Sequence, residues 1–185
     1  MLTLVMALAV AKGIRQTLGR DSREAVAKVG IKWPNDIVVD GKKVCGILTE
    51  MSMEQGYIHH IVIGVGINVR RQEFSEEIRE RAAAIDEQCG VCISRSQLIA
   101  DIMEAFEEDY EIFLQTHDLK GLRDSYAKLL LNQDREVCVL DPKGEYRGIA
   151  RGINDQGELI VERQDGTVEE VYAGEVSVRG VYGYV

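Results

Sequence analysis

The stretch IKWPNDIVVDGKKVCGILTE, residues 31–50, decides how the rest of the chain is interpreted. Two apolar runs, at 37–39 and 44–48, flank the dipeptide Asp40-Gly41. A tight turn needs positive φ angles, which glycine tolerates, so Asp-Gly between β-branched runs indicates a β-hairpin. The stretch therefore predicts two antiparallel strands joined by this turn.

A lysine precedes this hairpin. Trp33 stands before Pro34, and the proline ring favours extended backbone at the residue before it. We therefore expect Lys32 at the end of a strand, next to a rigid turn, where its ammonium group can offset negative charge on a phosphate or a carboxylate. The alternative is a solvated lysine at a strand end, and spacing alone leaves both interpretations open.

Composition limits the classes of partner. The chain has 185 residues, 45% hydrophobic and 29% charged, which is typical of a soluble globular protein that forms a core without disulfide bonds. The formal net charge of −9 argues against a nucleic-acid partner, because phosphate binding needs clustered lysine and arginine. A small anionic ligand held by one or two local cations remains compatible with this charge.

The first segment is strongly apolar. Residues 2–18 carry apolar side chains on nearly every helical face, which predicts a deeply buried helix that ends near Gly19. The segment lacks the basic start and the cleavage site of a signal peptide, and no stretch approaches the roughly 20 apolar residues of a membrane span. Because termini usually lie at the surface, a core helix at this place leads us to expect that something normally precedes or covers it.

The rest of the chain changes character near residue 132. We expect strands at about 29–33, 37–40, 43–51 and 57–69, and helices at about 75–88, 95–115 and 118–130. Beyond this point come short β-rich runs separated by turn signals at 141–144, 154–157 and 165–166. The chain is therefore divided into 1–132, an α+β domain with a mixed or antiparallel sheet and helices, and 133–185, a small β-barrel or sandwich.

A Gly-x-Gly motif stands in the longest predicted strand. Gly64 and Gly66 fall within IGVGIN, residues 63–68, and a glycine in a strand usually marks a bulge or a close backbone approach. Backbone without side chains at these positions suits a flat ligand, and Gly46 leaves the backbone of the facing run exposed in the same way. The side-chain amide of Asn68 offers one hydrogen-bond donor group and one acceptor to such a ligand. Simple core packing is the alternative for these glycines.

Other motifs carry no chemistry of their own. Cys89 and Cys92 form a lone C-x-x-C without the second ligand pair that zinc needs, and the four cysteines are expected to be free thiols in a reducing cytoplasm. His59 and His60 are adjacent in a predicted strand, so their side chains point to opposite faces. With His117 alone at a helix end, we predict no metal site.

The motifs together resemble one family. KWPND at 32–36, GKKVCGILTE at 41–50 and IGVGINV at 63–69 occur in the order and at the spacing of the biotin protein ligases. The segments 148–157 and 173–179 resemble the small SH3-like C-terminal domain of that family. The resemblance covers nearly the whole chain and implies a central α+β domain similar to that of class II aminoacyl-tRNA synthetases.

The resemblance implies a two-step reaction. Biotin and ATP, supplied with Mg²⁺, give biotinyl-5'-AMP, and a lysine of a biotin carboxyl carrier domain then accepts the biotin as an amide. Lys32 would be the catalytic lysine that touches the biotin carboxylate and the α-phosphate. The biotin- and ATP-binding residues implied by the motif match are Lys32, Trp33, Asn35, Gly46, Ile47, Gly66 and Asn68.

The chain also departs from the family pattern. Nothing in residues 1–31 matches the Gly-Arg-Gly-Arg-x-Gly-Arg loop that closes over biotin and the phosphates in these ligases. We therefore expect an N-terminally incomplete catalytic domain with weak or no activity as given. We expect no DNA-binding winged helix. We expect the protein to be a cytoplasmic homodimer. The alternatives are a non-catalytic binding or dimerisation module and a lipoate ligase relative.

Overall fold

The computed structural model describes residues 1–141, 144–173 and 177–180. Its helices are α1 (Leu2–Gly19), α2 (Arg23–Ala27), α3 (Ile85–Cys89), α4 (Arg95–Thr116) and α5 (Arg123–Ala127). Its strands are β1 (Val29–Lys32), β2 (Asp36–Val39), β3 (Lys42–Glu54), β4 (Tyr57–Ile67), β5 (Glu136–Leu140), β6 (Tyr146–Ile153), β7 (Leu159–Arg163), β8 (Val168–Val171) and β9 (Ser177–Gly180). The described part of the chain is thus an α+β structure with antiparallel sheets, as predicted.

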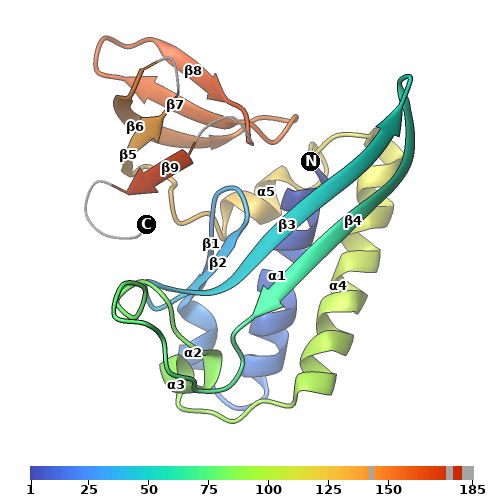
Figure 1. Ribbon diagram of the computed structural model, residues 1–185, viewed down its shortest axis with the longest axis vertical. Coiled ribbons are helices and arrows are strands. Elements are labelled where there is room, and N and C mark those ends of the chain that lie inside the picture. Colours follow the sequence, from blue (N-terminus) through green and yellow to red (C-terminus); the bar gives the residue numbers. More distant parts are fainter. Residues whose placement is uncertain (142–143, 174–176, 181–185) are drawn as a thin grey trace.

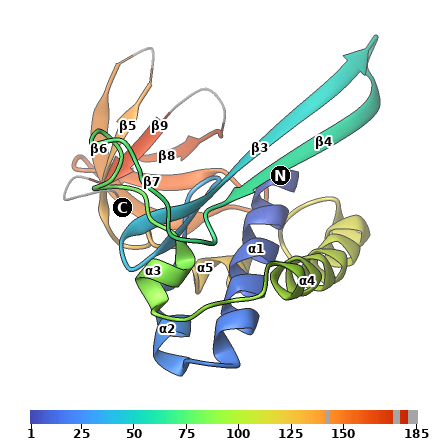
Figure 2. The same cartoon turned by 60° about the horizontal axis from the view of Figure 1, so that its bottom comes forward.

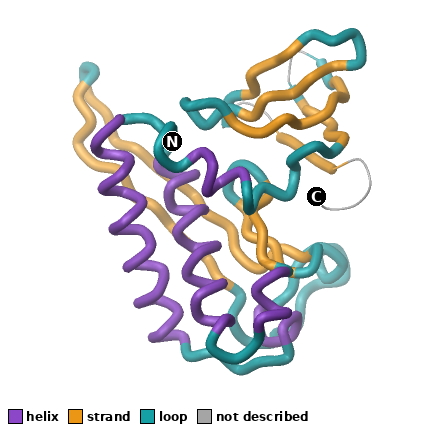
Figure 3. Tube along the Cα trace, turned by 180° about the vertical axis from the view of Figure 1, so that it is seen from behind, coloured by secondary structure: helices purple, strands orange, loops and turns teal. Residues whose placement is uncertain are grey.

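Helix α1 forms the centre of the core. Its residues from Leu4 to Ala11 are all buried, and so are Ile14 and Leu18 farther along. Figure 1 shows α1 behind strands β3 and β4 and beside α4, and Figure 3 shows the two long helices on one face of the sheet. A helix that is apolar on every face needs cover on every side, and these neighbours provide it. The predicted buried helix is confirmed.

Helices α1 and α4 cross at very short distance. A Cβ atom placed on Gly13 would lie 2.5 Å from Ile102 Cγ1 and 2.7 Å from the Ile102 backbone, so the crossing depends on glycine. Near it, Asp101 of α4 accepts hydrogen bonds from Thr17 of α1 and from Arg20, which directly follows α1, and is itself only 1% exposed. The Arg20 guanidinium and these hydrogen bonds hold the pKa of Asp101 well below its usual range.

The first sheet has the antiparallel order β1-β2-β3-β4. Asp40 and Gly41, with φ angles of 48° and 78°, form the tight turn between β2 and β3, which confirms the predicted hairpin. Strands β3 and β4 continue well past the helices as a two-stranded arm that ends at Gln55 and Gly56, as Figure 2 shows. Met51, Met53, Tyr57 and Ile58 on this arm are exposed.

The second sheet, called the C-terminal sheet below, has the antiparallel order β8-β7-β6-β5-β9. Among the described residues its edge strands β8 and β9 do not pair with each other, so the SH3-like barrel stays a prediction. The predicted turn at 141–144 and the predicted family segment 173–179 lie partly outside the described residues. The division of the chain at residue 132 likewise stays a prediction.

Two predicted helices were wrong in extent. Residues 75–82 form turns rather than a helix, because this segment pairs with β3: Lys43 N donates to Arg81 O at 2.7 Å, and Ala83 N donates to Lys43 O at 3.0 Å. Only α3 at its end is helical. The helix expected at 118–130 shrinks to α5, because Leu129 and Leu131 form hydrogen bonds with Ile31 of β1 instead. In both places, backbone pairing to a distant strand outweighs local helix propensity.

No helix in the described part of the chain is long and apolar enough to cross a lipid bilayer.

The helix crossing gives a first test. Gly13→Ala is expected to lower the free energy of unfolding by at least about 1 kcal/mol, because overpacking at the Ile102 backbone outweighs the roughly 1 kcal/mol by which alanine favours a helix. Urea unfolding measures this change. Gly19→Ala is the matched control, since its Cβ would lie at an ordinary 3.6 Å from Val26. Equal stability of the two variants would contradict the close crossing.

Candidate functional site

A row of four paired residues crosses the first sheet. In register, Lys32 of β1 pairs with Asp36 of β2, Asp36 with Gly46 of β3, and Gly46 with Gly66 of β4. Directly paired residues point to the same face of an antiparallel sheet. This face is the one opposite α1, because Ile37, Cys45 and Ile47, which alternate with the row, are buried in the core around α1. The row therefore brings the predicted lysine and the predicted glycines onto one face.

A pocket of about 690 Å³ opens at the β3–β4 end of this row. Strands β3 and β4 form one wall of the pocket, and the loop that follows β4 forms the other. The residues that line it are Lys43, Cys45, Gly46, Gly66, Ile67, Asn68, Phe74, Ile78, Arg81 and Ala82. The pocket thus combines bare strand backbone, one amide side chain, two cations and several apolar side chains.

Sequence reasoning missed both cations of the pocket, Lys43 and Arg81. Lys43 Nζ forms an ion pair with Asp36, and a Cβ atom on Gly46 would lie 3.1 Å from that same Nζ. Simple alternation would place residues 43 and 46 on opposite faces of the strand. A β-bulge at Val44 restores the match, because Ile37 pairs with Cys45 while Val38 pairs with Lys43. The consecutive apolar residues Val44 and Cys45, both buried, are the only sequence signal of this bulge.

Lys32 does not line the pocket. It is 8% exposed, at the far end of the row from Gly66. Burial lowers its pKa, Asp36 raises it, and the nearby cations Lys43, Arg179 and Arg81 lower it further. Because Arg81 comes from the loop after β4 and Arg179 from β9, three separate parts of the chain bring positive charge to this corner of a protein whose net charge is −9.

Three other predicted binding residues make internal contacts. Asn35 donates from Nδ2 to Ile47 O at 2.8 Å and accepts at its own carbonyl from Ile47 N at 3.0 Å, so it fixes β3 to the turn. The Ile47 side chain is buried against the core. Trp33 is 1% exposed, and its indole Nε1 donates to Gly157 O at 3.0 Å. These residues support the site from behind, and their roles in binding stay predictions.

Asn68 lines the pocket, and its role in binding stays a prediction. Its backbone N donates to Val44 O at 2.8 Å, which holds it at the end of β4. Its side-chain Oδ1 accepts from Gln72 Nε2 at 2.9 Å. The amide can therefore present its Nδ2 donor to a ligand, and Gln72 fixes which way the amide points.

The cysteines and histidines form no metal site among residues 1–141, 144–173 and 177–180, where no group of three metal-ligating side chains occurs. Cys92 is exposed and accepts a hydrogen bond from Arg70, while Cys45 is buried, and burial raises the pKa of its thiol to about 12. His59 lies at the surface beside Glu54.

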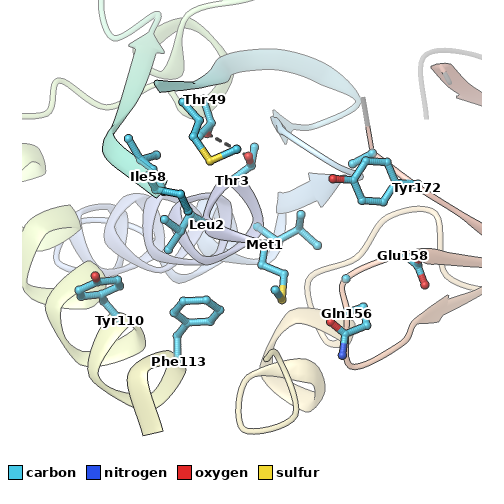
Figure 4. A pocket seen from close by; sticks show the side chains of 15 residues that line it. Met1, Leu2, Thr3, Thr49, Ile58, Tyr110, Phe113, Gln156, Glu158 and Tyr172 are labelled. Carbon is cyan, nitrogen blue, oxygen red and sulfur yellow. Dashed lines mark hydrogen bonds between the residues drawn. The ribbon is translucent and has the colours of Figure 1, made fainter. Parts of the chain in front are cut away.

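A second, mainly apolar cavity of about 590 Å³ lies elsewhere, between the start of α1, the arm, α4 and the C-terminal sheet. Figure 4 shows Met1 and Leu2 facing Phe113 of α4, with Gln156 and Glu158 of the C-terminal sheet on the opposite side. Thr3 and Thr49, at its wall, share a hydrogen bond of 2.9 Å. It contains none of the predicted site residues.

Comparison with known proteins gives the family. The model of the "Biotin/lipoate A/B protein ligase family" matches residues 1–68, and that of the "Biotin protein ligase C terminal domain" matches residues 134–179. The bifunctional ligase/repressor BirA of Bacillus spizizenii is 36% identical over 182 residues, which cover 96% of this chain. The chain belongs to the biotin protein ligase family. It spans 52% of the length of that relative, about half.

Solved structures of biotin protein ligases share the fold. A point mutant of the Aquifex aeolicus enzyme in complex with biotin has a TM-score of 0.79 and 26% identity, over 97% of this chain and 70% of that one. The enzyme from the same organism in complex with biotin and ATP has a TM-score of 0.75 and 25% identity, over 96% and 72%. The architecture of this ligase-family chain is therefore that of biotin protein ligases over nearly its whole length.

Burial of Lys32 gives a second test. A lysine whose pKa is lowered by folding costs stability below its folded pKa, and this cost disappears as pH rises through its unfolded pKa of about 10.4. Lys32→Met is therefore expected to be more stable than wild type at pH 7, with a difference that shrinks toward pH 10. Urea unfolding at both pH values measures it. Lys42→Met, near the surface beside Arg79 O, is the control and should leave stability unchanged.

Proposed function

We propose that this chain carries the biotin- and ATP-binding site of a biotin protein ligase, in the pocket between β3, β4 and the loop after β4. The observation that carries the proposal is the row from Lys32 to Gly66, which ends in a pocket with Lys43, Arg81 and Asn68. Cations beside bare backbone suit an anionic, flat ligand. Membership of the family supports biotin and ATP as the ligands.

The first step of the proposed reaction joins biotin to AMP. A carboxylate oxygen of biotin attacks the α-phosphorus of ATP, the bond to the β-phosphate breaks, and pyrophosphate leaves. Negative charge grows on the α-phosphate oxygens during this step. Lys43 Nζ, next to Gly46 and held by Asp36, is placed to stabilise that charge, with Lys32 behind it on the same row. This assignment gives Lys43 the role that sequence reasoning gave to Lys32 alone.

We propose that biotin lies along the bare backbone of β3 and β4. A Cβ at Gly66 would lie 3.9 Å from Gly46 O, and one at Gly46 would meet Lys43, so side chains here would occupy the ligand's place. Asn68, beyond Gly66, is proposed to contact the adenine. Mg²⁺ is proposed to arrive with ATP as part of the substrate.

The second step transfers biotin to a protein. A lysine amine of a biotin carboxyl carrier domain attacks the acyl carbon of biotinyl-AMP, an amide bond forms, and AMP leaves. The carrier lysine is proposed to enter at the β3–β4 end of the row, where the pocket opens.

The lysine pair at 42 and 43 tests the proposed site. Titration calorimetry with biotinyl-adenylate should give an affinity for Lys43→Met at least about tenfold weaker than wild type, because a charge-assisted hydrogen bond to the phosphate is lost. Lys42→Met, one residue away but outside the pocket, should stay within about twofold. Equal losses in both variants would place the phosphate elsewhere.

Catalysis is tested separately from binding. ATP-dependent transfer of biotin to a carrier domain, by this chain, supports the ligase activity. Binding of biotinyl-adenylate without any transfer supports the non-catalytic alternative. Displacement of the bound ligand by lipoate, but not by biotin, would favour a lipoate ligase.

The exposed arm supports the proposed homodimer. Met53 and Ile58 pair across the two strands and are 53% and 47% exposed, on an arm whose β4 edge is unpaired among the described residues. Such an edge pairs readily with another strand.

Light scattering tests the dimer. Wild type should have twice the 20.7 kDa of one chain, and Met53→Lys should be a monomer, because a charge on the arm opposes its burial. Leu114→Lys, an equally apolar and 47% exposed position on α4, should keep the wild-type mass. A monomeric wild type contradicts the dimer.

A further inference from the structure

The single tryptophan connects two parts of the chain that are far apart in sequence. Trp33 donates from its backbone N to Asn132 Oδ1 at 2.9 Å and from its indole Nε1 to Gly157 O at 3.0 Å. Trp33 and Asn132 are 1% and 0% exposed. Both N–H groups of Trp33 therefore form buried hydrogen bonds with residues 99 and 124 positions away in the sequence.

Both partners are themselves held firmly. Asn132 follows a short segment that runs beside β1, where Ile31 N donates to Leu129 O at 2.7 Å and Leu131 N donates to Ile31 O at 2.8 Å. Gly157 belongs to the tight loop between β6 and β7, called the β6–β7 loop below, which is residues 154–158. Trp33 therefore contacts fixed groups, which can set its position.

The β6–β7 loop is anchored to the helical part of the chain. Asp155 accepts at its backbone O from Leu119 N at 2.8 Å, and its Oδ1 pairs with Arg123 at 2.8 Å. A Cβ atom on Gly157, where φ is +81°, would lie only 2.8 Å from Leu119 and 3.0 Å from Leu4. Figure 4 shows the neighbouring Gln156 and Glu158 beside the cavity at the start of α1. The loop is therefore anchored to α5 and its preceding turn, and Gly157 packs closely against Leu119 and Leu4.

On its other side, Trp33 adjoins the row of the candidate site. Lys32 is its immediate neighbour, and Asn35 and Asp36 complete the following turn. Asn35 holds β3 through its hydrogen bond to Ile47, and Asp36 forms the ion pair with Lys43. Figure 1 shows the C-terminal sheet next to strands β1 and β2. A displacement of Trp33 by the β6–β7 loop would be passed to this turn and to the row.

We infer that Trp33 is a positioning residue, through which Asn132 and the β6–β7 loop fix the Lys32–Asp36 turn in the geometry that the site needs. The C-terminal sheet is then part of the machinery of the site rather than an attached module. What the site binds rests on the proposed function. Trp33 itself does not line the pocket, so it acts through Lys32, Asn35 and Asp36.

The chain offers a matched pair of glycines for the test. Gly157 and Gly166 have φ angles of 81° and 82°, and both lie in turns of the C-terminal sheet. A Cβ at Gly166 meets nothing within 4 Å, whereas one at Gly157 meets Leu119 and Leu4. Alanine at either place causes the same backbone strain, but only Gly157→Ala displaces the carbonyl that Trp33 needs.

Fluorescence and hydrogen exchange measure the effect without any ligand. Because Trp33 is the only tryptophan, Gly157→Ala should shift its emission to the red and make it more accessible to acrylamide, and Gly166→Ala should not. In Gly157→Ala, the amides of Trp33 and Ile47 should exchange faster. If Ile47 exchanges at the wild-type rate while Trp33 is exposed, the turn does not depend on Trp33 and the inference is overturned.

Binding then separates positioning from general stability. Trp33→Phe keeps an aromatic ring but loses the indole donor. The affinity of this variant for biotinyl-adenylate should be about tenfold weaker than that of wild type, and a cooperative melting transition should show that the variant is folded. Adding Gly157→Ala to Trp33→Phe should cause no further loss, because both changes break one contact. Fully additive losses would overturn the inference. If Gly157→Ala does not fold, Trp33→Phe and the exchange of its Ile47 amide decide the matter.

Failure of the proposed function gives a different pattern. If wild type does not bind biotinyl-adenylate, the proposed ligand is wrong. The exchange rates at Ile47 in Gly157→Ala and Gly166→Ala still confirm or overturn the positioning role of Trp33.

Discussion

The burial of α1 on all sides is the constraint on which the rest of the structure depends. A helix with no polar face must be covered by other elements, and the first sheet, α4 and the β6–β7 loop each cover one part of it. Gly13 lets α4 approach within contact of its backbone, and Leu4 packs against Gly157 of the C-terminal sheet. The first sheet packs one face against this helix, and its opposite face carries the row of the candidate site.

The parts of the fold that depend on local pattern were predictable from the sequence. The buried helix, the Asp40-Gly41 hairpin and the long amphipathic α4 follow from periodicity and turn chemistry, which neighbouring residues determine. The helix expected at 75–88 was wrong because Lys43 supplies a backbone partner from far along the chain. The periodicity of apolar residues carries no information about such a distant partner, so the turns at 75–82 could not be predicted from the sequence.

The candidate site was predictable in part, for a related reason. The motifs identified Lys32, Gly46, Gly66 and Asn68, and strand register brings the first three into one row. The place of Lys43 in the pocket could not be predicted, because simple alternation along the strand assigns its side chain to the face opposite that of Gly46. The internal role of Trp33 depends on Gly157, which is 124 positions away, and no local pattern predicts that hydrogen bond.

The bulge at Val44 has a consequence for how this hairpin tolerates change. Deletion of Val44 would remove the bulge and leave Lys43 and Gly46 two positions apart on a regular strand, so both would still belong to the face of the row. A single deletion in a regular part of β3 would instead turn the side chains beyond it to the opposite face. The bulge is therefore a point at which this strand can change its length without changing which groups it presents to the site.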